Sequence, residues 1–164
     1  MQASDAAVAP GGDQINLACF EVQGRAYAID VAHVREIVRP QEITPLPKAP
    51  VLIEGVVELR GDVVPVLDLG RVLGGDPCEP GNRSRIVVLE CDGLVVGVSV
   101  EAATEVLALD YTALEDVPVL AAHAGYEVVR AVVRREGSKP VMVLSLEHIL
   151  ESVYRSALSQ QVEQ

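Results

Sequence analysis

The sequence predicts a mainly β protein made of two clusters of four or five short strands, each cluster followed by a helical element. Two observations favour this fold class. The 164-residue chain holds 29 Val and seven Ile, and β-branched side chains fit a pleated, half-buried surface better than a helix interior. Turn signals also separate short apolar segments, with no alternation of strand, long helix and strand. Paired small β-barrels or sandwiches therefore fit better than a parallel α/β fold.

The first predicted elements are a tail and a hairpin. Residues 1–13 are small and polar and include Pro10-Gly11-Gly12, which predicts a flexible N-terminal tail. Residues 15–22 and 26–29 are apolar segments that flank a turn at Gln23-Gly24-Arg25. We expect these two strands to pair in antiparallel fashion across the turn.

A helical turn and a connector are predicted next. Asp30 is a suitable N-cap for a turn at residues 31–35. The chain then extends through Glu36-Ile37-Val38, where the alternation of side chains along a strand places Glu36 on the solvent side. Four prolines fall within residues 39–50. Because proline cannot donate a hydrogen bond to a sheet, this segment is expected to be an extended connector.

The second predicted hairpin leads into a short helix. Two apolar runs between residues 55 and 69 meet at Gly61-Asp62, where glycine tolerates the positive φ of a tight turn. Asp68 is placed to cap a helix at residues 69–73, and Gly74-Gly75 stops that helix. The linker between the two strand clusters is predicted near residues 74–83, because this stretch is rich in proline and glycine.

Further strands and one long helix complete the expected elements. Arg85–Cys91 and Leu94–Val100 form the clearest hairpin, since Asp92-Gly93 suits both positive-φ positions of a type I′ turn. The remaining predictions are a strand at 103–109, an irregular or briefly helical stretch at 111–124 and a hairpin formed by 126–134 and 141–146. A single apolar stripe then predicts a helix capped by Ser145, with these stripe residues: Leu146, Ile149, Leu150, Val153, Ala157 and Leu158.

The domain boundaries follow from these elements. Residues 14–158 are expected to form a single domain of two subdomains, and residues 159–164 a C-terminal tail. No apolar run is long enough to cross a bilayer, and the first residues do not resemble a secretory signal. The net charge of −11 disfavours nucleic acid and anionic membrane surfaces as partners, because the chain repels phosphate.

The cysteines and histidines give no sign of catalytic chemistry. Three widely spaced cysteines, Cys19, Cys78 and Cys91, predict neither a disulfide framework nor a zinc site. Cys19 and Cys91 lie in apolar segments and are expected to be buried and inert, which fits a reducing compartment. The three histidines have no metal-ligand or triad spacing, and no nucleophile elbow, phosphate loop or dinucleotide fingerprint is present. We therefore predict no enzyme, no cofactor and no metal.

Three features are nevertheless unusual for an inert domain. Arg60 stands beside a tight turn in Glu58-Leu59-Arg60-Gly61, where its planar donor group is either a solvated tip or an anchor for a partner. One acidic residue, Glu36, interrupts the aliphatic segment Val34-Arg35-Glu36-Ile37-Val38. The chain has few aromatic residues, so its many valines must form the core or line a groove that receives a partner helix.

These features together resemble the CheW family of bacterial chemotaxis coupling proteins, over residues 15–158. The resemblance lies in an ordered set of motifs, most specific in the first half: Tyr27-Ala28-Ile29-Asp30, Val34-Arg35-Glu36-Ile37-Val38, Ile43-Thr44-Pro45-Leu46-Pro47, Gly55-Val56-Val57-Glu58-Leu59-Arg60-Gly61, Val64-Pro65-Val66-Leu67-Asp68-Leu69 and Leu73-Gly74. The second half is similar but less distinctive: Val95-Val96-Gly97, Glu105-Val106-Leu107 and Leu144-Ser145-Leu146-Glu147.

The resemblance implies a fold and a function. The implied fold is two SH3-like five-stranded β-barrels that share a hydrophobic core, with short helices and a C-terminal helix. The implied function is a non-catalytic cytoplasmic adaptor at receptor arrays beneath the inner membrane. Its partners would be the regulatory domain of a CheA-type histidine kinase and the cytoplasmic tip of methyl-accepting chemoreceptors. No nucleic acid, membrane insertion, cofactor or metal is expected.

The resemblance also implies two sets of site residues. A receptor-binding groove would be lined by Val34, Glu36, Ile37, Val88, Val96 and Val106, with Glu36 paired to a cation of the receptor. A partner-binding hairpin would consist of Glu58, Arg60 and Gly61, in which Gly61 holds the backbone that presents Arg60. Residues 43–51 and 110–124 are candidate kinase-facing surfaces.

Departures from the family pattern leave an alternative open. Glu58 stands where the family usually has asparagine, which puts a charge beside Arg60. The late segment 129–137 holds few of the glycines that are common in the family. These changes suggest a divergent member that serves a gliding, pilus or other chemosensory pathway in place of the main flagellar one. The alternative function is a CheW-like regulatory or small-ligand-binding domain that does not couple a receptor to a kinase.

Overall fold

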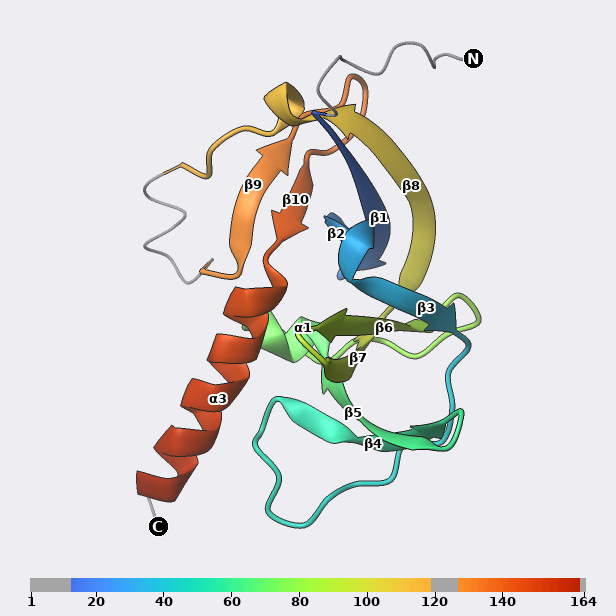
Figure 1. The fold of residues 1–164 in the computed structure, drawn as a ribbon, viewed down its shortest axis with the longest axis vertical. Coiled ribbons are helices and arrows are strands. Elements are labelled where there is room, and N and C mark those ends of the chain that lie inside the picture. Colours follow the sequence, from blue (N-terminus) through green and yellow to red (C-terminus); the bar gives the residue numbers. More distant parts are fainter. Residues whose placement is uncertain (1–12, 119–126, 163–164) are drawn as a thin grey trace.

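The computed structural model describes residues 13–118 and 127–162, which fold into two five-stranded sheets and one long C-terminal helix (Figure 1). The first sheet has the order β8-β1-β2-β10-β9, with these bounds: β1 Gln14–Val22, β2 Arg25–Asp30, β8 Ala102–Asp110, β9 Val129–Val133 and β10 Val141–Leu144. The second has the order β3-β6-β7-β5-β4, with these bounds: β3 Val34–Val38, β4 Ile53–Leu59, β5 Asp62–Asp68, β6 Arg85–Cys91 and β7 Leu94–Val100. The predicted mainly β fold of two five-stranded units is confirmed.

The two sheets share one arrangement. Each sheet consists of two antiparallel hairpins joined by a parallel pair of strands, plus one edge strand. In the first sheet the hairpins are β1–β2 and β9–β10, and β2 pairs with β10 in parallel. In the second sheet the hairpins are β6–β7 and β4–β5, and β7 pairs with β5 in parallel. The second sheet is inserted into the first, because the chain leaves the first sheet after β2 and returns to it at β8. The linker predicted near 74–83 lies between β5 and β6 of the same sheet. Its prolines and glycine therefore mark a loop, and the chain passes between the sheets at Asp30–Val34 and Val100–Ala102, which carry no such signal.

In three hairpins the two central residues of the turn both have positive φ, and the second of them is glycine. These pairs are Gln23-Gly24 (56° and 72°), Arg60-Gly61 (51° and 83°) and Asp92-Gly93 (50° and 84°). Such angles at both central positions are typical of type I′ turns, whose twist matches that of the strands. The turn predicted at Gly61-Asp62 is thus one residue too late: Asp62 already pairs with Leu59, and the turn is formed by Arg60 and Gly61.

The helical elements begin at side-chain caps. They are η2 Val31–His33, α1 Leu69–Val72, η3 Tyr111–Ala113 and α3 Leu146–Val162. Asp30 accepts a hydrogen bond from the Ala32 N–H at 2.9 Å, and Asp68 accepts one from the Arg71 N–H at 3.1 Å. These two predicted caps are confirmed, although the helical turn after Asp30 ends at His33 because strand β3 begins at Val34.

The long helix α3 descends from the end of β10 beside the second sheet (Figure 1). The Ser145 hydroxyl accepts a hydrogen bond from the His148 N–H at 3.3 Å, which confirms this cap. The helix runs to Val162, so residues 159–162 of the predicted C-terminal tail are helical. No glycine or proline stops it there. The predicted N-terminal tail, apart from Asp13, and residues 119–126 lie outside the described residues.

The buried side chains form three apolar clusters. One lies between the sheets and is shared by both, with α3 and α1 against it; its largest fully buried members are Leu67, Leu69, Leu89, Leu144, Ile29 and Ile149. Each sheet also has a cluster of its own. Cys19 is buried as expected, and burial raises the pKa of its thiol to about 11. Cys91 is only partly buried, because it ends β6 at the turn.

Candidate functional site

Arg60 and Glu36 form a bidentate ion pair at the rim of the second sheet. Arg60 Nη2 lies 2.9 Å from Glu36 Oε1, and Arg60 Nε donates to Glu36 Oε2 at 3.1 Å. The turn conformation of Arg60 holds its side chain at the tip of the β4–β5 hairpin, where it is 78% exposed. Two parallel hydrogen bonds fix a guanidinium more firmly than a single charge contact does. The pair therefore links strand β3 to the hairpin.

Glu36 does not lie on the solvent side of β3, where it was predicted. Burial alternates regularly along the strand: Val34, Glu36 and Val38 are half-buried, whereas Arg35 and Ile37 are exposed. The Glu36 side chain is only 22% exposed, and the Arg60 guanidinium compensates its charge. The alternation is thus obeyed, but the solvent side is the one with Arg35 and Ile37, and a contact from the next hairpin lets the carboxylate occupy the other side.

The ion pair predicts an altered titration of Glu36. The hydrogen bonds from Arg60 lower the pKa of Glu36 below its ordinary value of 4.5. Because the pKa of Glu36 is lower in the folded state than in the unfolded state, the ion pair stabilises the fold at a pH above the ordinary pKa. This stabilisation is lost as the pH falls through the folded-state pKa. Arg60→Gln should raise the Glu36 pKa toward its ordinary value, as measured by carbon NMR of the side-chain carboxyl. Arg134→Gln, which removes a different exposed pair with Glu115, should leave it unchanged. An unshifted Glu36 titration in Arg60→Gln would contradict the pairing.

The other predicted receptor-groove residues do not share one surface. Ile37 is 43% exposed on β3, and Val106 is 64% exposed on β8 of the first sheet. Val88 and Val96 are buried, the first in the cluster of the second sheet and the second in the shared cluster. Val88 nevertheless lies directly across from Glu36 in the β3–β6 register, and both line a small hollow beneath Arg60.

The predicted hairpin residues lie together, and Arg60 is paired with a residue outside the hairpin. Glu58 is exposed and faces Val63 across the hairpin, and it joins no ion pair with any residue that the structure describes. Arg60 bonds to Glu36 instead. The sequence reasoning missed Val63, which is 68% exposed beside the turn. With the turn at Arg60-Gly61, the alternation of side chains along β5 predicts an exposed Val63, because Val64 and Val66 are buried on the core side.

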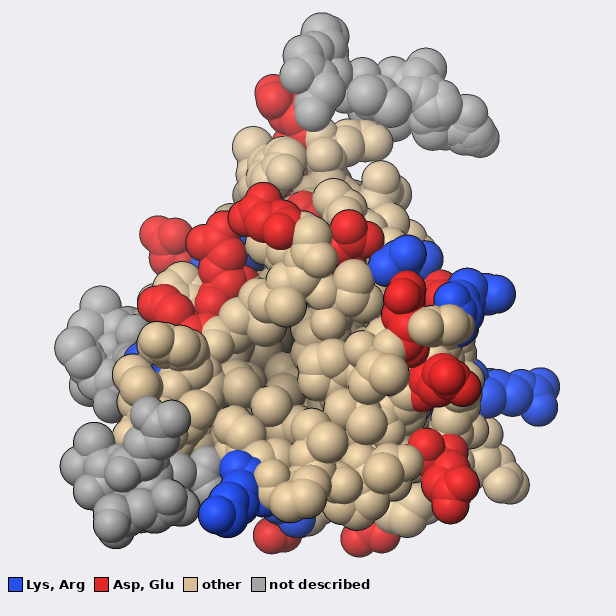
Figure 2. Space-filling model, turned by 60° about the horizontal axis from the view of Figure 1, so that its bottom comes forward, with Lys and Arg blue, Asp and Glu red and all other residues tan. Residues whose placement is uncertain are grey.

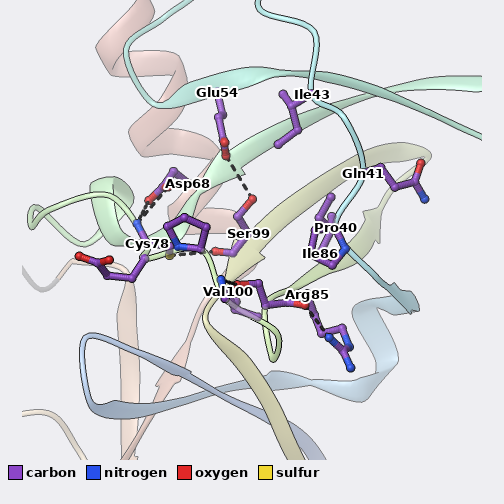
Figure 3. Close-up of a pocket in the computed structure, with 14 residues that line it drawn as sticks. Pro40, Gln41, Ile43, Glu54, Asp68, Cys78, Arg85, Ile86, Ser99 and Val100 are labelled. Carbon is purple, nitrogen blue, oxygen red and sulfur yellow. Dashed lines mark hydrogen bonds between the residues drawn. The ribbon is translucent and has the colours of Figure 1, made fainter.

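A hollow of about 280 Å³, lined by both polar and apolar side chains, lies on another side of the second sheet (Figure 3). Asp68, the one buried charged residue of the described chain, accepts hydrogen bonds there from the Cys78 N–H at 3.1 Å. Ser99 donates to Glu54 at 3.2 Å, and burial raises the pKa of the Glu54 carboxyl. Gln41 and Arg85 lie on the opposite side of the hollow (Figure 3). Burial raises the pKa of the Cys78 thiol to about 12, so this cysteine is a poor nucleophile.

Two further observations bear on function. Within residues 13–118 and 127–162, no group of His, Cys, Asp and Glu side chains is arranged to hold a metal ion. In the same part of the chain, no helix has the length and apolar character needed to span a bilayer. His33 and His148, far apart in sequence, line one shallow hollow at the start of α3, while His123 lies outside the described residues.

Comparison with known proteins gives consistent matches. A family model described as a CheW-like domain matches residues 16–154. The chain is 30% identical over 141 residues to the chemotaxis protein CheW of Rhizobium meliloti, which covers 86% of this chain and 90% of that protein. It is 32% identical over 144 residues to the protein FrzA of Myxococcus xanthus, with 86% and 88% covered. The crystal structure of the scaffolding protein TtCheW from Thermoanaerobacter tengcongensis superposes with a TM-score of 0.75 at 27% identity, over 82% of this chain and 86% of that one.

Proposed function

Because this chain belongs to the CheW-like family, we propose that it is a non-catalytic adaptor that couples chemoreceptors to a CheA-type histidine kinase. The observation that carries this proposal is the extent of the likeness. The family match runs from within β1 to within α3, and so includes strands of both sheets and the shared core. Relatives named as chemotaxis proteins match over most of the chain. The adaptor would act in the cytoplasm, at receptor arrays beneath the inner membrane.

Exposed apolar residues next to Glu36 and next to the β4–β5 turn support a binding role. Ile37 follows Glu36 on β3 and is 43% exposed, and Val63, near the start of β5, is 68% exposed. Arg60 is exposed at the β4–β5 turn, with its guanidinium held by Glu36. Exposed aliphatic side chains and an arginine of fixed orientation are typical of protein–protein contacts. In this proposal the β3 side, with Val34, Glu36 and Ile37, receives the helical tip of the receptor.

The remaining site residues have supporting roles in the proposal. The hairpin Glu58–Gly61 contacts the regulatory domain of the kinase. Val88 and Val96 act from beneath the surface, because their burial lets them hold β6 and β7 in place behind β3. Val106 would extend the receptor contact onto the first sheet. The ion pair joins β3 to the β4–β5 hairpin. It therefore holds the proposed receptor surface and the proposed kinase surface in a fixed position relative to each other.

The central experiment is a calorimetric titration with two purified partners from the same organism. One is the regulatory domain of a CheA-type kinase, and the other is a cytoplasmic fragment of a chemoreceptor. Saturable binding of both supports the coupling role. Absence of kinase binding overturns it. If a small ligand then raised the melting temperature, the alternative role as a small-ligand-binding regulatory domain would be favoured, with the hollow around Asp68 and Glu54 as its site.

Ile37 provides a test of the receptor surface alone. Ile37→Asp should weaken binding of the receptor fragment by roughly tenfold or more, because a charge replaces an apolar contact at the centre of the proposed surface. Leu46→Asp is a matched control, since both residues are 43% exposed and Leu46 lies in the connector before β4. The same titration measures both variants. Equal receptor affinities for the two variants would contradict the placement of the receptor on β3.

A further inference from the structure

An apolar groove of about 260 Å³ lies between α3 and the second sheet. Its lining side chains come from the sheet and from the helix: Ile53, Pro65, Leu67, Leu94, Val96, Leu150, Val153, Tyr154 and Ala157. We call it the α3 groove. Figure 2 views the molecule with the bottom of Figure 1 brought forward. It shows a hollow of uncharged side chains in the middle and charged residues toward the margins.

The α3 groove lies on the opposite face of the strands from the Glu36–Arg60 surface. Val64 and Val95 line the small hollow beneath Arg60, whereas their neighbours Pro65, Leu94 and Val96 line the groove. Successive side chains of a strand point to opposite faces of a sheet. The same two strands, β5 and β7, therefore line the two hollows from opposite faces. Val96, which is buried at the floor of the groove, is the one residue that the groove shares with the predicted receptor-binding set.

No residue within 13–118 or 127–162 covers the groove. Leu94 is 52% exposed and Tyr154 is 68% exposed, and Leu158, one helical turn after Tyr154, is 44% exposed. A contiguous apolar hollow with exposed aliphatic and aromatic edges is the kind of surface that monomeric proteins use for binding. A trough between a helix and a sheet fits a second helix, whose apolar stripe enters the trough.

Carboxylates without ion-pair partners stand at the margin of the α3 groove. Asp92 and Glu147 both lie near the thiol of Cys91, whose pKa they raise in addition to the effect of burial. Cys91 pairs with the groove residue Leu94 in the β6–β7 hairpin. Glu151 follows Glu147 by one turn on the same side of α3. None of these three carboxylates joins an ion pair with any residue within 13–118 or 127–158.

We propose that the α3 groove is a second docking surface and that its occupant is an amphipathic helix with an aliphatic stripe flanked by lysine or arginine. The apolar floor selects the stripe, and the unpaired carboxylates select the flanking cations. A second copy of this chain is the poorer occupant, because each copy carries a net charge of −11 and the two repel. The inference does not depend on the coupling role.

A synthetic helix tests this proposal directly. The probe is a fluorescently labelled peptide of about four helical turns, with leucines on one face and lysines on the others. It is titrated with the full chain by fluorescence anisotropy. We expect saturable one-to-one binding, and a scrambled peptide of the same composition should not bind. A third peptide with glutamate in place of lysine should not bind either, because the groove margin is acidic.

Matched variants locate the binding. Leu94→Lys and Tyr154→Lys should each weaken the affinity by roughly tenfold or more. Thr104→Lys makes the same charge change at an exposed site of β8 on the first sheet, outside both proposed binding surfaces, and should have no such effect. Equal binding of the scrambled peptide, or equal affinities for Leu94→Lys and Thr104→Lys, would overturn the proposal. So would sedimentation of the free chain as a dimer that Tyr154→Lys dissociates, since the occupant would then be a second copy.

Discussion

Replacing Arg60 by Glu is expected to abolish binding of the kinase regulatory domain and to leave the melting temperature nearly unchanged. The side chain of Arg60 is 78% exposed, and an ion pair at such a site contributes little to stability, so its loss costs the fold little. The new carboxylate faces Glu36 at the rim, and the two negative charges repel, which turns the contact surface acidic. Calorimetric titration measures the binding, and a thermal melt by circular dichroism measures the fold.

A matched arginine separates this effect from a general change of charge. Arg134 is 77% exposed and its Nε lies 2.7 Å from Glu115, a close counterpart of the Arg60 pair on the first sheet. Arg134→Glu should leave kinase binding intact. Equal loss of binding in both variants would show that net charge, and not the hairpin, governs the interaction. A lowered melting temperature in Arg60→Glu would show that the residue is structural.

The double variant Glu36→Arg with Arg60→Glu then separates two roles of Arg60. It restores an attraction between the two positions with reversed polarity. If the guanidinium at the turn contacts the kinase, binding stays lost although the pair is restored. If the double variant binds normally, Arg60 serves only to hold β3 against the hairpin, and the proposed kinase contact at the hairpin is wrong.

Gly70→Ala is expected to have the largest effect on stability. Gly70 is buried in α1, where an added Cβ would overlap the carbonyl oxygen of Asp76 and lie 3.1 Å from both Asp68 Oδ1 and the Cys78 nitrogen. The clash is with backbone, which must shift, and such overpacking costs about 1–3 kcal/mol or more. In a chain of this size, each kcal/mol lowers the melting temperature by about 2–4 °C. Thermal denaturation of the purified variant measures the shift.

Gly75→Ala is the control for Gly70→Ala. The residue lies only a few positions away, but its added Cβ would meet only the Gly70 carbonyl oxygen, at an ordinary 3.6 Å. Its φ is not positive, so alanine is tolerated there. A melting temperature for Gly70→Ala equal to that of Gly75→Ala would show that the loop at residues 76–78 is free to move away from α1.

Local signals in the sequence predict much of this fold because local chemistry decides it. The pair Asp92-Gly93 defines its hairpin without help from the rest of the chain, and Asp68 caps α1 through a neighbour three residues away. The same logic applied to Arg60-Gly61 would have placed that turn correctly, since the glycine takes the second position in all three pairs. The predicted turn is displaced there because Gly-Asp is itself a common hairpin-turn pair, and only the register of the two strands shows that Asp62 pairs with Leu59.

The site depends on contacts that no single segment reveals. Alternation along β3 is regular, but it does not tell which of its two sides faces the solvent, because the side chain that compensates the Glu36 charge comes from the next hairpin, β4–β5. Val96 and Leu94 look alike in the sequence, yet one is buried and the other forms the edge of the α3 groove. The stripe on α3 predicts a buried face, and it does not show that Tyr154 remains exposed beside that face.

The insertion of the second sheet into the first sets an order for biosynthesis. A ribosome delivers β1 and β2 first, but β10, the parallel neighbour of β2, is among the last strands to emerge. The five strands of the second sheet emerge in one uninterrupted stretch, from Val34 to Val100, so this sheet can assemble while the rest of the chain is still being made. The shared cluster closes only when Leu144, Leu146 and Ile149 arrive. Truncated translation products would therefore display the Glu36–Arg60 surface on an open apolar core, where chaperones and proteases recognise them.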